Sequence, residues 1–209
     1  IPYFLDQKRT VLHHPAVELV RSALEAVIGR WHNDAVFRCV KTELLFPIGD
    51  DEDPDSAAAL RDAMCRLENY VLAAGIQGYR WTEPRRWTYR VGSMLDDVQE
   101  SAMADADEAF YEEMDRLRHL IVRPLSELED GLREAGTVRE MAEALYRFLE
   151  RLDVPGKLER WSRDCLEQGR PEKAREHAQV WSSLVDLLDQ IVEMMGDERI
   201  ASDRLAGIV

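Results

Sequence analysis

The sequence predicts a mainly α-helical protein, a multi-helix, bundle-like assembly with one short strand at its N-terminus. Apolar residues recur at intervals of three and four through most of the chain, as one buried helix face requires. Helix start and stop signals, mainly Ser, Thr, Asp, Pro and Gly, separate these segments. Only the apolar run Ile1–Leu5 suggests a strand. It has no convincing parallel partner later in the chain, so we expect it to be frayed or paired with a neighbour.

Two helices are predicted before the first break in the chain. The first covers 16–28, with apolar positions Val17, Val20, Leu24, Val27 and Ile28. Asp34 is the expected N-cap of the second, whose apolar positions are Val36, Phe37, Val40 and Leu44. Pro47, Gly49, a run of acids and Pro54 follow, so we place a domain boundary between residues 48 and 49.

The region 49–209 is predicted to be a helical insertion. Asp55 or Ser56 is expected to cap a helix that ends near Gly75, where glycine takes the left-handed conformation. An irregular Trp/Arg-rich segment, 77–92, separates it from a long helical stretch that begins at Ser93. We expect Pro124 to kink that stretch or to divide it in two.

Further helices are predicted towards the C-terminus. Thr137 and Glu140 have the spacing of a capping box at the start of one helix. Val154–Gly156 is interpreted as a turn before a shorter helix that Gly169 closes. Pro171 suits the first turn of the next helix, and Ser202 is expected to start a last one.

Composition limits the classes of function. The 209 residues carry a net charge of −14, which disfavours strong autonomous binding to a phosphate backbone. Three scattered cysteines, Cys39, Cys65 and Cys165, argue against a disulfide framework and favour a reducing compartment, so we expect a cytoplasmic protein. No apolar run approaches the roughly 20 residues that would span a bilayer, and no membrane partner is expected.

Searches for catalytic motifs find none, so no catalytic residue is predicted. The sequence contains no GxxxxGK[ST], GxSxG or HExxH. His13 and His14, and the pair Asp115 and His119, are the nearest approaches to metal-ligand spacing. Adjacent histidines before Pro15 are more typical of a helix cap or a solvent-facing loop, so we predict no metal site.

One segment has the residue types of a nucleic-acid surface. Arginines neutralise phosphates and interleaved aromatic rings stack on unpaired bases. The candidate DNA-binding residues are Arg80, Trp81, Arg85, Arg86, Trp87 and Arg90. The competing interpretation, which we favour, is that the tryptophans anchor this loop onto the helices while the arginines pair with the acids of 96–115.

Several short blocks resemble AddB-type subunits of bacterial AddAB helicase–nucleases. The resemblance begins with 1–9 and 13–27, at the strand and helix near motif IV of superfamily 1 helicases. It continues through Phe37-Arg38, Lys41-Thr42, 67–72, Gly75-Ile76, Gly78, Trp81, Arg123-Pro124-Leu125, Trp181, 187–190 and 205–209. It implies that 1–48 resemble the start of helicase domain 2A and 49–209 a 2B-like insertion.

The resemblance also implies the setting of such a segment. A complete subunit would act in double-strand-break end processing and recombinational repair with an AddA-type partner, and would use ATP, Mg and an iron–sulfur cluster. None of the family's catalytic residues matches a position here, so the segment itself is expected to be non-catalytic, cofactor-free and architectural. The terminal strand would mark where the motor-like fold was cut.

Three alternatives stay open. The chain has the features expected of the same insertion from a UvrD/Rep-type helicase. It also fits a stand-alone helical adaptor with a peptide groove between its helices. A metal-dependent helical hydrolase is the third, although no local motif supports it.

Overall fold

The computed structural model describes residues 13–46, 54–89 and 100–199. Within these ranges the protein forms α-helices and one 3-10 turn, with no strand, so the mainly α prediction is confirmed. The predicted strand Ile1–Leu5 and the helix after Ser202 lie outside these ranges. The elements are α2 (Pro15–Ile28), α3 (Asn33–Lys41), α4 (Pro54–Ala73), η1 (Gly78–Trp81), α5 (Glu100–Glu134), α6 (Val138–Arg151), α7 (Val154–Glu167) and α8 (Pro171–Met195).

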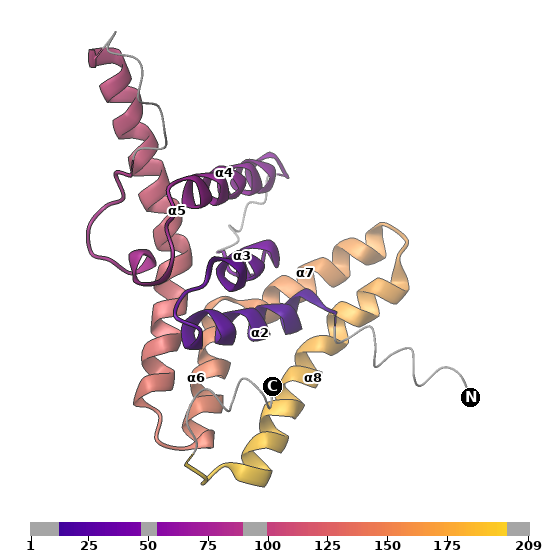
Figure 1. Cartoon of the computed structure of the whole chain (residues 1–209). Coiled ribbons are helices and arrows are strands. Elements are labelled where there is room, and N and C mark those ends of the chain that lie inside the picture. The colour runs from indigo at the N-terminus through magenta and orange to yellow at the C-terminus, as the bar shows by residue number, and fades with distance from the viewer. Residues whose placement is uncertain (1–12, 47–53, 90–99, 200–209) are drawn as a thin grey trace.

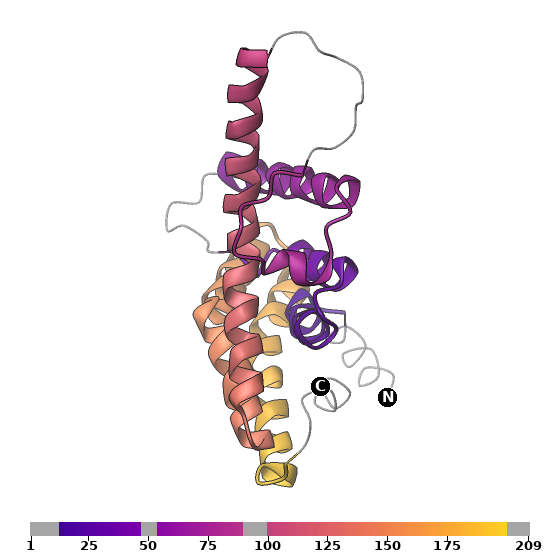
Figure 2. The same cartoon turned by 60° about the vertical axis from the view of Figure 1, so that its left-hand side comes forward.

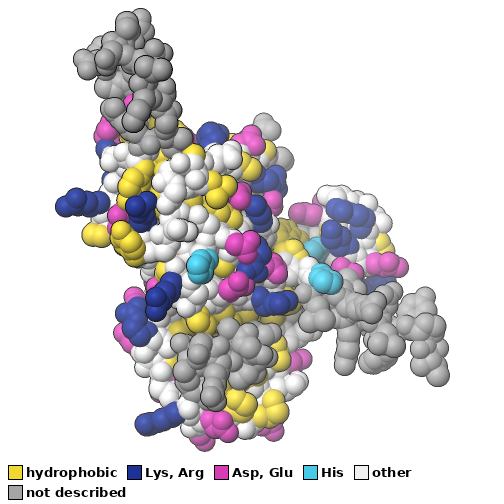
Figure 3. All heavy atoms as spheres, in the orientation of Figure 1, with side chains coloured by type: hydrophobic (Ala, Val, Ile, Leu, Met, Phe, Trp, Pro, Cys, Tyr) yellow, Lys and Arg dark blue, Asp and Glu magenta, His cyan; other side chains and the backbone are white. Residues whose placement is uncertain are grey.

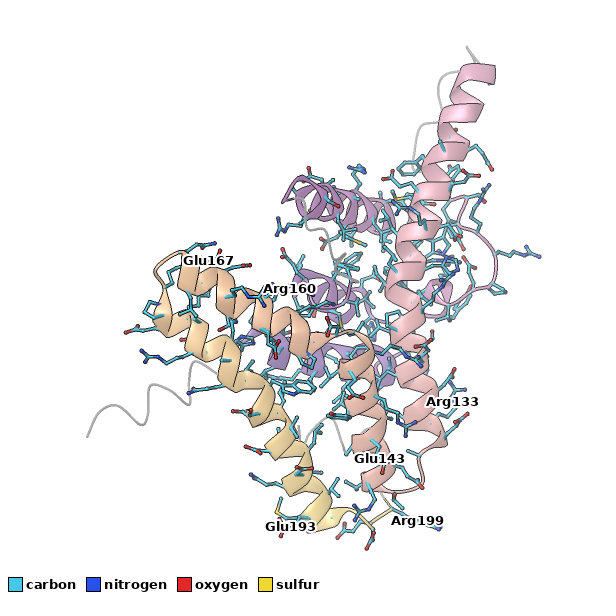
Figure 4. The ribbon with its side chains drawn as sticks, turned by 180° about the vertical axis from the view of Figure 1, so that it is seen from behind. Arg133, Glu143, Arg160, Glu167, Glu193 and Arg199 are labelled. Carbon is cyan, nitrogen blue, oxygen red and sulfur yellow. The ribbon has the colours of Figure 1, made fainter. Side chains whose placement is uncertain are left out.

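The long helix α5 is the spine of the fold (Figures 1 and 2). Helices α2 and α4 pack against it, α3 lies between them and packs on α2, and α6 runs back alongside the C-terminal half of α5. Helices α7 and α8 form an antiparallel hairpin, and α8 also packs on α6. Seen from behind, Glu167 lies at one end of that hairpin and Glu193 near the far end of α8 (Figure 4).

One hydrophobic core joins these helices. It takes fully buried side chains from α2, α3, α4 and α5, and continues into α6, α7 and α8. Because α2 and α3 share this core with the rest, the helices on both sides of the proposed boundary at residues 48 and 49 are packed together. The boundary itself falls within 47–53, outside the described residues, and stays a prediction.

Local signals set most helix ends as predicted. Thr137 and Glu140 form the capping box of α6 with both reciprocal hydrogen bonds, and Pro171 occupies the first turn of α8. Gly75 and Gly169 take left-handed conformations, with φ of 62° and 70°, just after α4 and α7. These positions need only neighbouring residues for their effect, which is why sequence alone locates them.

Two predicted helix starts are wrong. His32, not Asp34, is the N-cap of α3, and Asp34 lies inside the first turn, where it pairs with Arg38 at 3.0 Å. Helix α4 begins at Pro54, so Asp55 and Ser56 fall within its first turn. Acidic residues stabilise the first turn of a helix as well as its cap, so the sequence signal fits both placements.

Two predicted interruptions are absent from the described residues. Pro124 does not divide α5, which is continuous from Glu100 to Glu134. Ile121 and Leu125 are fully buried on either side of the proline, so packing on common neighbours offsets the lost backbone hydrogen bond. The predicted turn at 154–156 is the first turn of α7, because Asp153 alone, with φ of 51°, makes the reversal.

A buried lysine ties α7 to the segment that follows α3. Lys157 Nζ donates hydrogen bonds to the carbonyls of Leu44 and Phe46, at 2.8 and 2.5 Å. Its side chain is 1% exposed, and burial lowers the pKa of Lys157 to about 8. None of the described helices is long and apolar enough to cross a membrane.

Candidate nucleic-acid surface

The predicted DNA-binding loop connects α4 to α5 and contains the 3-10 turn η1. Gly78 starts this turn with φ of 64°, and its N–H donates to the carbonyl of Trp31 at 3.2 Å. A side chain at Gly78 would be strained in this conformation. The loop is therefore fixed at its base to the connection between α2 and α3.

Trp81 is fully buried at the centre of this loop. Its Nε1 donates to Asn33 Oδ1 at 2.9 Å, and Asn33 Nδ2 donates to the carbonyl of Ile76 at 2.7 Å. The ring of Phe37 packs edge-on against it, with centroids 5.7 Å apart. Asn33 thus uses both ends of its amide to join α3 to the loop.

Trp87 is fully buried beside Trp81, with ring centroids 5.2 Å apart in an edge-on arrangement. Its Nε1 donates to the carbonyl of Arg80 at 2.9 Å, and the guanidinium of Arg118 lies over its ring, 4.9 Å from the centroid. Neither tryptophan presents a ring face to solvent. Their proposed stacking on bases is therefore corrected to an anchoring role, as the competing interpretation held.

Arg118 is a residue of this site that the sequence did not indicate. Its side chain is 3% exposed, and its Nη2 lies 3.0 Å from Asp115 Oδ1. Its Nη1 donates to the carbonyl of Arg85 at 3.1 Å. An arginine on the face of α5 resembles any surface arginine in sequence. Its partner in the loop lies 33 residues away, so only the fold identifies it.

The predicted arginines have different surroundings. Arg80 is half-buried, donates to the carbonyl of Gly75 at 3.2 Å and lies over the ring of Tyr89, 5.2 Å from its centroid. Arg86 is exposed and pairs with Glu108 of α5 at 2.8 Å, while Arg85 is exposed on the adjoining position. Arg90 lies outside the described residues. DNA binding by these residues stays a prediction.

The aromatic ring that the loop does present to solvent is Tyr79, which is 74% exposed on η1. Glu83, by contrast, is engaged inside the loop, where it accepts a hydrogen bond from the Tyr89 hydroxyl at 2.9 Å. The loop is therefore anchored by two buried tryptophans and presents an exposed tyrosine and exposed arginines to solvent.

The residues with metal-ligand spacing have other partners. His119 Nδ1 bonds to the backbone carbonyl of Asp115 at 2.7 Å and lies 3.4 Å from Asp115 Oδ2, while Asp115 Oδ1 contacts Arg118. His13 is exposed, whereas His14 is buried and caps α2. Across 13–46, 54–89 and 100–199, no three His, Cys, Asp or Glu side chains gather as a metal site.

The cysteines also lie apart, on three helices. Cys39 and Cys165 are buried on α3 and α7, and Cys65 is exposed on α4. Burial raises the pKa of the Cys39 thiol to about 12, so it stays protonated and donates to Ser22 Oγ at 3.2 Å. These residues do not fit an iron–sulfur cluster, which needs about four converging thiolates.

Comparison with known proteins relates this sequence to subunits named as parts of an ATP-dependent helicase/deoxyribonuclease. No family model matches the sequence. Over all 209 residues, the chain is 45% identical to the AddB-type subunit of the ATP-dependent helicase/deoxyribonuclease of Geobacillus thermodenitrificans. It is 46% identical over 201 residues to the corresponding subunit of the same name from Bacillus mycoides. The AddB-type resemblance is confirmed.

The matched part is a limited portion of each relative. The chain spans about 17% of the length of these AddB-type subunits, while 96% to 100% of the chain itself is aligned. The names of the AddB-type relatives specify an ATP-dependent helicase and a deoxyribonuclease. The names do not say in which of those activities this part of the subunit takes part.

Proposed function

We propose that this chain is a non-catalytic helical module of an ATP-dependent helicase/deoxyribonuclease subunit. The parent subunit would act in double-strand-break end processing and recombinational repair, together with an AddA-type partner. ATP, Mg and an iron–sulfur cluster would be bound elsewhere in that assembly. The module would correspond to a 2B-like insertion with the edge of domain 2A, and its work would be in the cytoplasm.

The architecture of the loop carries this proposal. Trp81, Asn33 and Arg118 join α3, the loop and α5 through contacts that are partly buried and directional. Groups with unusual environments elsewhere, such as Lys157 and His14, are likewise engaged in internal contacts between helices. This arrangement supports a rigid scaffold that holds a DNA channel and docks against a partner.

An activity assay tests the non-catalytic part of the proposal. The purified chain is expected to hydrolyse no ATP and to cut no single- or double-stranded DNA in the presence of Mg²⁺. The complete subunit with its AddA-type partner is the positive control in the same buffers. Robust ATPase or Mg²⁺-dependent nuclease activity of the chain alone would overturn the proposal.

A binding assay tests the DNA-channel role. Fluorescence anisotropy of labelled single-stranded DNA at low salt is expected to show weak binding that Arg85→Ala/Arg86→Ala reduces. The double variant Arg133→Ala/Arg147→Ala, which removes two exposed arginines from α5 and α6, is the matched control. Equal affinity of the wild type and the Arg85/Arg86 variant would exclude the loop as a DNA contact and leave only the scaffold role.

A further inference from the structure

The folded loop is less basic than its sequence suggests. Between 77 and 89 it carries Arg80, Arg85 and Arg86 against Glu83. Helix α5 then brings Glu108 and Glu112 to Arg86, so three arginines are matched by three glutamates. The face seen in Figure 3 likewise shows basic and acidic side chains interspersed. A phosphate backbone approaching this loop therefore meets no net positive charge.

Arg86 is the arginine whose positive charge these two glutamates offset. Its Nη2 lies 2.8 Å from Glu108 Oε1, and its Nη1 lies 3.8 Å from Glu112 Oε1. The side chains of Arg86, Glu108 and Glu112 are 35%, 56% and 67% exposed. Ion pairs with this exposure are weak, so a phosphate group is able to displace the carboxylates.

Arg85 and Tyr79 lie on the same loop, and no carboxylate of the described residues pairs with Arg85. The backbone of Arg85 is fixed by Arg118, and its exposed side chain makes no ion pair within 13–46, 54–89 and 100–199. Tyr79 is exposed on η1, seven residues before Arg86. An exposed ring on a loop that also carries exposed arginines suits an unpaired base and a nearby phosphate, because stacking needs a free ring face.

We propose that Glu108 and Glu112 compete with phosphate for Arg86 and so weaken the binding of single-stranded nucleic acid at Tyr79 and Arg85. The bound strand would stack a base on Tyr79, place one phosphate against Arg85, and gain a second against Arg86 when the carboxylates are displaced. This inference rests on the proposed DNA contact of the loop and assigns it a ligand class and an internal competitor.

The decisive variant is Glu108→Gln/Glu112→Gln, which keeps side-chain size and removes both negative charges. Its affinity for labelled oligothymidine is expected to rise about threefold to tenfold at low salt, because two nearby charges no longer repel the strand. The dependence of log affinity on log salt should steepen by about 0.7 for the one phosphate gained. Glu127→Gln/Asp130→Asn is the control, since it removes two exposed acids from the same helix away from the loop.

Tyr79 variants test the stacking part. Tyr79→Phe keeps the ring and is expected to bind like the wild type, whereas Tyr79→Ala should lose about fivefold or more. Duplex DNA of the same length should be insensitive to Tyr79→Ala, because its bases are already stacked. A loss of duplex and single-strand binding by the same factor would contradict the assignment of an unpaired base to this ring.

The outcomes separate this inference from the proposed DNA contact. If Arg85→Ala/Arg86→Ala weakens binding but Glu108→Gln/Glu112→Gln equals its control, the loop binds DNA and the competition by carboxylates is wrong. If Glu108→Gln/Glu112→Gln strengthens binding and the Arg85/Arg86 variant abolishes that gain, both stand. A wild type and a glutamine variant that bind equally weakly, and that do not respond to loss of the arginines, would overturn both.

Discussion

His14 Nε2 lies 2.8 Å from His177 Nδ1, so two buried histidines join the start of α2 to α8. His14 Nδ1 accepts the N–H of Ala16 as the cap of α2. Its Nε2 must therefore carry the proton that it donates to His177, which fixes both rings as neutral. Trp161 of α7 packs against His177 with ring centroids 5.5 Å apart.

This pair predicts an acid-sensitive stability. Burial, with His177 and Lys173 nearby, lowers the pKa of His14 to about 4 from 6.5. Burial, Lys173 and Arg170 lower the pKa of His177 in the same direction. The unfolded chain thus takes up protons first as pH falls. The stabilisation is complete above pH 6.5 and is lost between about 6.5 and 4, by about 3 kcal/mol at most for His14.

Urea unfolding from pH 7.5 to 4 measures this dependence. His14→Asn keeps a good N-cap residue but cannot titrate, so its free energy of unfolding should fall less steeply over that window. His13→Asn removes the exposed neighbour and should follow the wild type. Equal slopes for wild type and His14→Asn would show that the histidine pair does not set the acid response.

Among the side-chain amides of the described residues, we expect the loss of Asn33 to lower the stability of the fold most. Asn33→Ala leaves the buried Trp81 Nε1 and the Ile76 carbonyl without their partners. Because unsatisfied buried groups cost about 1–3 kcal/mol each, we expect a loss of about 2–6 kcal/mol in the free energy of unfolding. Asn69→Ala, on the exposed face of α4, is the control and should change it by less than about 0.5 kcal/mol. A similar small change for both would mean that the Trp81 anchor relaxes onto other partners.

Lys157 predicts a response at the alkaline end. Its pKa of about 8 in the fold lies below the ordinary 10.5, because burial disfavours the charged form. Between these values the unfolded chain binds more protons, so stability should rise with pH. Relative to Lys157→Met, the wild type should gain about 2 kcal/mol between pH 7.5 and 10.

Chemical unfolding at both pH values, with Lys41→Met as control, measures that gain. Lys41 is exposed and pairs with Glu68 on the surface, so its replacement removes the same charge without the burial. A constant difference between wild type and Lys157→Met across the two pH values would contradict the buried titration.

Sequence reasoning located what is encoded by near neighbours. The capping box at Thr137, the helix ends at Gly75 and Gly169 and the start at Pro171 depend on residues within one turn, and all were predicted. The prediction that Pro124 divides the helix is wrong because the cost of the proline is local, whereas its compensation, the burial of α5 side chains, is tertiary. The sequence thus identifies the helical class, but it does not show whether burial in the core outweighs the cost of a proline inside one helix.

The candidate site shows the same limit. The Trp/Arg loop was recognisable from composition, but the burial of Trp81 and Trp87 depends on Asn33, Phe37 and Arg118, which lie on other helices. The ion pairs of the loop likewise depend on residues of another helix. The sequence predicts that the arginines pair with the acids of 96–115, but only the fold identifies Glu108 and Glu112 as the partners of Arg86 and leaves Tyr79 as the exposed ring.

Arg118 provides a test of how the loop is held. Arg118→Lys keeps the charge but loses the planar fork that reaches Asp115 and the Arg85 carbonyl together while lying over Trp87. We expect the loop to open more often, at a cost of about 1–3 kcal/mol in its local stability. Limited digestion with trypsin should then cut after Arg85 and Arg86 about fivefold or more faster than in the wild type. Arg116→Lys, exposed on the same helix, should leave that rate unchanged.

Because opening of the loop does not require global unfolding, the urea midpoint of Arg118→Lys should move less than its cleavage rate implies. Cleavage at the wild-type rate would show that the tryptophans hold the loop without Arg118.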